Sequence, residues 1–344
     1  MMSNSHSGKA DRLAFIDIAK GIGILSMILG HIESGYLTRM VYSFHMPLFF
    51  IISGYLLSDK TGVRDYAKKK TVQMFRPYAL TCAFLFAFEW LRALPNGGLS
   101  SSSMIRLLVS YGYGAGSSRL ALPEGVNLAG AIWFLPALLF AQLTVRLALQ
   151  SKLPALVVAC VSIASYCTSK VLWLPLSIQA GGFASMYVYI GYMAKQYRKS
   201  HESSKRIEGA LCLAALALWL LAMVVPGLYV VLAANYSDHL LPSIVISIVI
   251  SFAVLIVSAD LTGARSACSL MSFFGRNSLA VLCVHVCENR FIPWDSVGQA
   301  LHAANPFYRI LPIFFMKIIL IAACIRMLSA IPFFQKTLCI AQKH

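Results

Sequence analysis

Long apolar runs separated by short polar segments repeat along the whole chain. A helix needs roughly 20 mainly apolar residues to cross a bilayer, and most of these runs reach or approach that length. The pattern therefore predicts an all-α fold, a polytopic transmembrane helix bundle of about ten spans. The expected spans are 13–32, 42–58, 75–92, 131–149, 153–169, 179–196, 208–226, 241–260, 274–291 and 310–330.

Basic residues are distributed unevenly between the connecting loops. Loops 59–74 and 197–207 together hold nine Lys and Arg residues. Only five lie in the loops of the opposite set, which are 33–41, 93–130, 170–178, 227–240 and 292–309. Because cytoplasmic loops are enriched in Lys and Arg, both termini are expected to be cytoplasmic. The expected organisation is a tail over 1–12, a single transmembrane domain over 13–330 and a second tail over 331–344.

Composition supports a membrane protein. Hydrophobic residues make up 58% of the chain and charged residues 12%, whereas about a quarter of a soluble protein is charged. The net charge of +16 is concentrated in clusters such as "VRDYAKKK" and "KQYRKSHESSKR". Such clusters are typical of loops held against anionic lipid, so the expected partner is the lipid bilayer of the cell membrane and not nucleic acid.

Nine cysteines occur without a CxxC pair, mostly inside apolar runs. They are interpreted as small packing residues, and neither disulfides nor a metal site is expected. The long first apolar run is expected to be a retained span and not a cleaved signal peptide.

The first span carries two polar groups on one face. In "KGIGILSMILGH", Lys20 and His31 are eleven residues apart, which places them about 16.5 Å apart along a helix and within about 20° of the same direction. Asp17 is one turn from Lys20 and is able to pair with it. Either residue alone is explained by snorkelling or by a helix boundary. Together with His45, which opens the next run, they favour one site with two poles.

These residues also carry a resemblance. The stretch "RLAFIDIAKGIGILSMILGH…YSFHMPLFFIISGYLL" resembles the opening of the acyltransferase-3 family of integral membrane O-acyltransferases, in particular its fucose 4-O-acetyltransferase-like branch. That family shows a basic residue, ten intervening residues and a histidine, which match Lys20 and His31. The family often has arginine where this chain has Lys20. Weaker matches are "YAKKKTVQMFRPY", "IWFLPALL" and "FFGRNSLAVLCVH".

The resemblance implies that domain 13–330 transfers an acyl group, usually acetyl from acetyl-CoA, to a hydroxyl of an envelope or exported polysaccharide sugar, free or lipid-linked. No bound cofactor is expected. A sugar hydroxyl needs a base to remove its proton, and histidine is suited to that task near neutral pH. His31 is the candidate general base, with an acyl-histidine intermediate as a variant. His45 is a second candidate catalytic residue that orients the acceptor or His31.

The donor carries phosphates, which cationic groups at the cytoplasmic pole are suited to bind. The candidate donor-binding residues are Lys20, Lys69, Lys70 and Arg76. Supporting roles are assigned to Asp17 and to His285, which has Glu288 and Arg290 near it in sequence.

Two other functions remain open at this stage. A secondary transporter of a sugar or lipid-linked intermediate would use Lys20, Asp17 and His31 as a relay, although no matching pair of interrupted helices is evident. A noncatalytic partner of a polysaccharide synthase would tolerate loss of His31. The Gly-, Ser- and Tyr-rich loop 93–130 is either a connector or a functional loop that holds the acceptor through Tyr111 and Tyr113.

Overall fold

The computed structural model describes residues 4–32, 35–117, 119, 122–201, 204–263, 265–301 and 306–341. Helices dominate this part of the chain, in which β pairing is limited to one isolated bridge between Val231 and Tyr236. The α-helices are α1 Asn4–Gly30, α2 Tyr36–Tyr42, α3 His45–Tyr55, α4 Val63–Ala93, α5 Ser101–Tyr113, α6 Phe134–Ala148, α7 Pro154–Thr168, α8 Ile178–Ser200, α9 Lys205–Val224, α10 Leu240–Asp260, α11 Arg265–Arg276, α12 Ser278–Phe291, α13 Trp294–Ala300, α14 Pro306–Ser329 and α15 Pro332–Thr337. Short 3-10 helices are η1 Leu94–Asn96, η2 Gly130–Trp133, η3 Pro175–Ser177, η4 Leu232–Ala234 and η5 Leu261–Gly263.

The all-helical prediction is confirmed, and each of the ten expected spans overlaps a helix. By length and composition, four helices in the described residues are able to cross a membrane, and a fifth candidate is the bent pair α11–α12. By contrast, α3 has 11 residues and α7 has 15, fewer than the roughly 20 that a full crossing needs. The protein is therefore an α-helical membrane protein with four to five spans that meet this test.

The expected span 274–291 is not continuous. The chain bends by 77° between α11 and α12, at Asn277. The Asn277 side chain donates to the carbonyl of Phe273 and accepts from the backbone N–H of Ala341. A polar side chain that bonds the backbone in this way competes with the regular helical pattern, which explains the break. The break directs α12 along the cavity described below.

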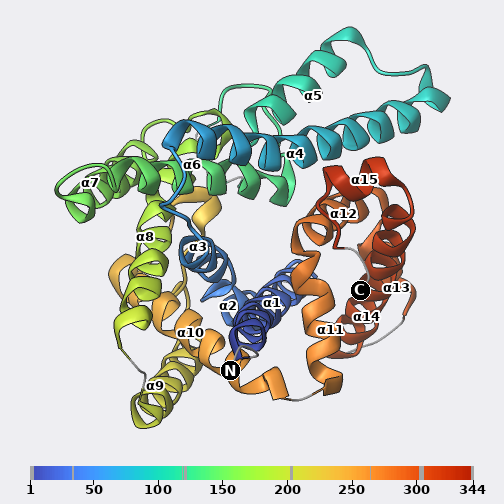
Figure 1. Cartoon of the computed structure of the whole chain (residues 1–344). Coiled ribbons are helices and arrows are strands. Elements are labelled where there is room, and N and C mark those ends of the chain that lie inside the picture. The colour runs from blue at the N-terminus through green and yellow to red at the C-terminus, as the bar shows by residue number, and fades with distance from the viewer. Residues whose placement is uncertain are drawn as a thin grey trace.

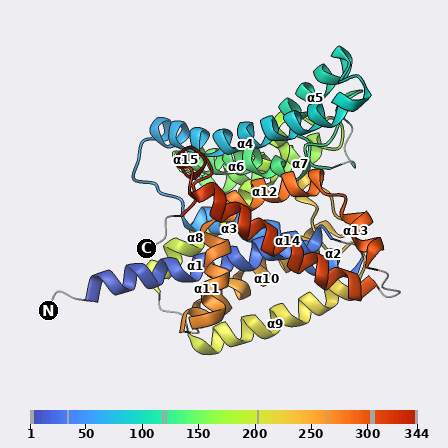
Figure 2. The same ribbon diagram turned by 90° about the vertical axis from the view of Figure 1, so that its right-hand side faces the viewer.

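The helices surround α1. In Figure 1, α1 is seen nearly end-on at the centre, with α2, α3, α10 and α11 around it. Its packing partners include α11, α10, α3 and α12. Helices α4, α6 and α7 form a layer to one side, with α5 projecting above it (Figure 2). The α1 helix is thus placed so that one of its faces is able to border an internal site.

Glycines allow the closest helix contacts. A Cβ atom at Gly54 of α3 would lie 1.8 Å from the carbonyl oxygen of Val188, and one at Gly191 of α8 would lie 1.9 Å from that of Ile51. The contact between α1 and α11 is built in the same way at Gly21. Small residues let helix backbones approach closely, which is a main source of helix association in a membrane. The α3 helix is therefore held directly against α8.

Two segments differ from simple loops or tails. The expected loop 93–130 contains α5, which begins after Ser100, whose hydroxyl accepts from the Ser103 backbone N–H, and ends at Gly114 in the left-handed conformation. These are standard capping signals of a helix. The expected tail 331–344 contains α15, and Leu338 and Ile340 after it are buried.

Candidate active site

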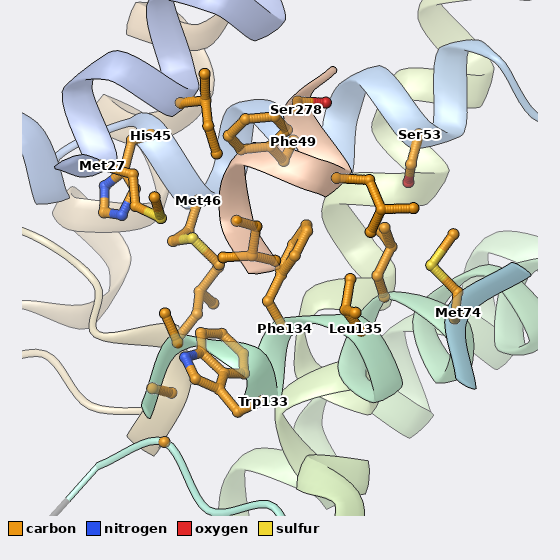
Figure 3. A pocket seen from close by; sticks show the side chains of 18 of the residues that line it. Met27, His45, Met46, Phe49, Ser53, Met74, Trp133, Phe134, Leu135 and Ser278 are labelled. Atoms are coloured by element: carbon orange, nitrogen blue, oxygen red, sulfur yellow. The ribbon is translucent and has the colours of Figure 1, made fainter. Parts of the chain in front are cut away.

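A cavity of about 540 Å³ lies within the helix bundle. It is bordered by α1, α3, α4, α6, α12 and the segment that follows α9. Figure 3 shows His45 on one side of this cavity, Met74 on the opposite side, and Trp133 and Phe134 projecting from η2 and α6. Most lining residues are apolar, so the few polar groups define what the cavity is able to bind.

One face of α1 lines the cavity over three turns. The lining residues are Lys20, Ile24 and Met27 of this helix and His31, which directly follows its last residue. Their spacing of four, three and four residues keeps them on one side of a helix. The shared direction that the sequence predicts for Lys20 and His31 is therefore present, with the two groups at different positions along one cavity.

Two of the candidate histidines are held in the same way. Nδ1 of His31 lies 2.7 Å from the carbonyl oxygen of Met27, and Nδ1 of His45 lies 2.9 Å from that of Val41. A carbonyl only accepts, so each Nδ1 carries the proton and each Nε2 is left with its lone pair. His31 is exposed, and it lines the cavity. Both side chains are thus set up as proton acceptors.

A third histidine completes the group. The ring centroid of His285 in α12 lies 5.2 Å from that of His31. The Tyr42 ring is close to both of the other histidines, with its centroid 4.9 Å from that of His45 and 6.5 Å from that of His31. His285 is completely buried and also lines the cavity. The structure therefore brings together His31 at the end of α1, His45 of α3 and His285 of α12.

His285 belongs to a mostly buried polar network that the sequence pattern did not predict. Nδ1 of His285 lies 2.8 Å from Glu288 Oε1, and Nζ of Lys317 in α14 lies 3.0 Å from the same oxygen. Asn289 contacts both His285, at 3.0 Å, and Lys317. The indole N–H of Trp294 donates to the second Glu288 oxygen. A lysine within the apolar run 310–330 is itself a signal of a functional site, and that signal was available.

Arg290 does not join this network. It forms an ion pair with Glu89 of α4 instead, although it is only two residues from Glu288. On a helix, positions two apart point away from one another, which explains why the two residues separate.

The opposite end of the cavity holds fewer cations than expected. Of the predicted donor-binding residues, Lys20 and Lys70 line the cavity, whereas Lys69 and Arg76 are exposed and outside the lining. The reason is the helical period of α4, which turns Tyr66, Lys70, Gln73 and Met74 toward the cavity. Asp17 lies within electrostatic reach of Lys20 and also stays outside the lining.

An aromatic and amide pair lies beside Lys70. The Tyr66 hydroxyl donates to Gln142 Oε1 at 3.1 Å. Two cations lie close to the Tyr66 ring. Lys70 Nζ is 5.9 Å and the Arg146 guanidinium is 5.6 Å from the ring centroid. This end of the cavity therefore combines positive charge with a flat aromatic surface.

Loop 93–130 reaches the cavity at Gly116 and Ser117 and not through its tyrosines. A Cβ atom at Gly116 would lie 2.1 Å from the Trp133 ring, so the two residues are tightly packed. Tyr111 is buried, and the Tyr113 hydroxyl donates to the backbone carbonyl of Trp173. Neither tyrosine is among the residues that line the cavity.

No group of His, Cys, Asp or Glu suited to hold a metal ion occurs in the described part of the chain.

The fold and the cavity together define a helical membrane protein with a histidine-bearing internal site. A family model described as an acyltransferase domain (Acyl_transf_3) matches residues 13–329. The chain therefore belongs to this acyltransferase family.

Two curated relatives are similar to part of the chain. A nodulation protein NolL from Sinorhizobium fredii (strain NBRC 101917 / NGR234) is 27% identical over 156 residues, which is 41% of this chain and 38% of that protein. A nodulation protein NolL from Mesorhizobium japonicum (strain LMG 29417 / CECT 9101 / MAFF 303099) is 27% identical over 111 residues, or 28% of this chain and 30% of that protein. The chain thus matches less than two fifths of either relative's length. No solved structure matches the chain significantly.

Proposed function

We propose that the protein is a membrane O-acyltransferase that moves an acetyl group from acetyl-CoA to a hydroxyl of an envelope or exported polysaccharide sugar. The observation that carries this proposal is the single cavity with Lys20 along one part of it and the proton-accepting Nε2 of His31 along another. The family to which the chain belongs supports the class of reaction.

In the proposed reaction, His31 is the general base. The acceptor hydroxyl oxygen attacks the thioester carbonyl carbon while His31 Nε2 takes the hydroxyl proton. The new C–O bond forms and the C–S bond breaks, so the thiolate of coenzyme A is the leaving group. The His31 imidazolium then gives its proton to that thiolate, which restores the neutral base. The Met27 carbonyl keeps Nδ1 protonated throughout.

His45 is suited to orient the acceptor. Its Nε2 has the same lone pair as that of His31, and it lies on the adjacent helix α3. An acceptor hydroxyl that donates to His45 is held in one direction while a neighbouring hydroxyl reacts at His31. Holding the reacting groups in a fixed geometry is itself a large part of catalysis.

The donor is proposed to lie along α1. Lys20 and Lys70 hold phosphate oxygens through charge-assisted hydrogen bonds. The thin apolar arm of the donor then passes Ile24 and Met27, which lie between the two poles. This order places the thioester close to His31.

The proposed topology has ten spans in the cell membrane, with both termini cytoplasmic. Support comes from the helices that overlap each of the ten expected spans and from the basic loops 59–74 and 197–207. Reporter fusions after Ala115 and after Lys199 test this topology. The first is expected to be outside and the second inside, and exchange of the two signals contradicts the arrangement.

The function is tested by incubating the purified protein in lipid with [¹⁴C-acetyl]-CoA and polysaccharide from cells that lack it. Labelled ester on the polysaccharide, lost after mild alkali, is the expected result. NMR of the polysaccharide from cells with and without the protein identifies the modified sugar. Uptake of an acceptor into vesicles without acetyl-CoA, and without an acetylated product, would instead indicate a transporter.

A further inference from the structure

We propose that Lys317 is a positioning residue that, through Asn289 and Glu288, holds His285 as a neutral imidazole beside His31. The proposal rests on a hydrogen-bond chain that crosses from α14 to α12 and ends at the histidine group. The side chains of His285, Lys317 and Glu288 are buried, at 0%, 1% and 4% exposed, whereas Asn289 is exposed and lines the cavity.

The direction of each hydrogen bond follows from Lys317. An ammonium group only donates, so the Asn289 atom that faces it is the amide oxygen. The Asn289 amide NH₂ group is then the part that faces His285 Nε2, at 3.0 Å. An NH₂ group only donates, so Nε2 accepts. The proton of His285 is therefore on Nδ1, which donates to Glu288 Oε1 at 2.8 Å.

A second proton on His285 conflicts with this chain. Protonated Nε2 would face the Asn289 NH₂ group, donor against donor. Rotating the Asn289 amide group so that its oxygen faces Nε2 removes that conflict. The NH₂ group then faces the Lys317 ammonium, and both of these groups are donors. Lys317 thereby excludes both arrangements, and it also compensates the Glu288 carboxylate through two contacts of 3.0 and 3.1 Å. A buried carboxylate without that cation would attract a proton to its histidine partner.

The consequence concerns His31. The titratable groups that face His285 are His31 of α1, Glu288 of its own helix and Lys317 of α14. A positive charge on His285, with its ring centroid 5.2 Å from that of His31, would oppose the uptake of a proton by His31 during the reaction. The network keeps that neighbour uncharged. His285 is therefore an uncharged residue that lines the site. It is not a second base, because neither of its ring nitrogens has a free lone pair.

The first test reads the protonation of His285 directly, without reference to activity. Protein labelled with ¹⁵N-histidine in lipid is measured by solid-state NMR between pH 5 and 8, and the His285 signals are assigned by their loss in His285→Gln. The unsubstituted protein is expected to show one protonated and one bare ring nitrogen. Lys317→Met is expected to show two protonated nitrogens over the lower half of this range. Neutral His285 in Lys317→Met throughout overturns the proposal.

The second test uses kcat against pH and rests on the proposed acyl transfer. In Lys317→Met, His285 must lose a proton before His31 accepts one, so the acidic limb of the profile is expected to move up by about one pH unit or more. KM for acetyl-CoA should stay unchanged. The double variant Lys317→Met/Glu288→Gln removes both charges and should move the limb back. An unshifted limb in active Lys317→Met overturns the proposal.

Controls separate this role from a general loss of stability. Lys170→Met removes a lysine that contacts only the carbonyl of Asn235 and nearby rings away from the cavity, and it should leave the profile unchanged. If Lys317→Met does not fold, Asn289→Asp keeps the lysine but faces Nε2 with a carboxylate. It should produce the same imidazolium signal, and a neutral His285 in this variant overturns the proposal. Absence of acyl transfer by the unsubstituted protein counts against the proposed function, while the NMR test still decides on the network.

Discussion

Nδ1 of His31 lies 2.7 Å from the carbonyl oxygen of Met27, one helical turn before it. The sequence places both residues on the cavity face of α1, and this contact decides which ring nitrogen is able to act. Because the carbonyl accepts the Nδ1 proton, Nε2 has a lone pair for the acceptor hydroxyl. If His31 is the base, as proposed, its orientation comes from a backbone carbonyl and not from a partner carboxylate, unlike the histidine of a serine protease.

His31→Ala is therefore expected to remove the proposed general base and to leave donor binding nearly unchanged. Turnover should fall by about 10²–10⁴, the usual contribution of general-base catalysis. Acetyl-CoA affinity, measured by calorimetry in detergent, should stay nearly unchanged, because a neutral histidine contributes little to distant phosphates. His201→Ala is the matched control, since His201 is exposed and stacks on Tyr197. Equal loss in both variants would count against His31 as the base.

Lys20 is expected to affect the donor and not the chemical step. Lys20→Ala should weaken acetyl-CoA binding by roughly 1.5–3 kcal/mol if one charge-assisted hydrogen bond is lost. Lys20→Arg should bind the donor well, because the positive charge is kept at a position where the resembled family often has arginine. Affinity and kcat are measured on the same preparations. A Lys20→Ala variant with normal affinity and low turnover contradicts the assignment of the donor to this end of the cavity.

Neighbouring lysines of α4 provide a sharper comparison. Lys70 lines the cavity, whereas Lys69 is exposed and outside it. Lys70→Ala is expected to lower acetyl-CoA affinity by about 1.5 kcal/mol or more, and Lys69→Ala by less than about 0.5 kcal/mol, as for a surface substitution. Both variants remove one positive charge, so a difference between their acetyl-CoA affinities is due to the position of the lysine and not to the net charge. Equal losses would mean that the donor contacts the outside of α4.

The sequence predicts that Lys20 and His31 share one direction, and both line the cavity; of the three α4 cations that it groups with them, only Lys70 is among the lining residues. The spacing of Lys20 and His31 is a property of one helix, and a single helical period is enough to place them together. Charge alone groups Lys69 and Arg76 with Lys70. In the structure, the helical period of α4 directs Lys70 toward the cavity and leaves the other two outside its lining. Charge identifies a cluster, but the direction of the helix face decides which of its members line the cavity.

Contacts between distant helices were beyond the sequence. His285, Glu288 and Asn289 lie within two turns of α12. The donor and acceptor roles in their hydrogen bonds nevertheless depend on Lys317, which is 28 residues after Asn289. The bend at Asn277 also depends on a distant group, the backbone N–H of Ala341. Hydropathy patterns record where helices form and which faces are apolar. They do not record which polar group on one helix meets which group on another.

The glycine contact between α3 and α8 is predicted to control both stability and the cavity. Gly191→Ala adds a Cβ atom that would lie 1.9 Å from the carbonyl oxygen of Ile51, so the helices must separate. Overpacking of this kind costs about 1–3 kcal/mol. Unfolding temperature in lipid nanodiscs should fall, and turnover with it, since α3 also carries His45.

Gly209→Ala is the matched control for this contact, because a Cβ atom there has no neighbour within 4 Å. It replaces glycine within a helix by a better helix former, so stability should stay equal or rise by up to about 1 kcal/mol. If Gly191→Ala behaves like Gly209→Ala, α3 and α8 are not in backbone contact at this point. In that case the position of His45 relative to His31 must depend on other helices that contact α3, such as α1 and α2.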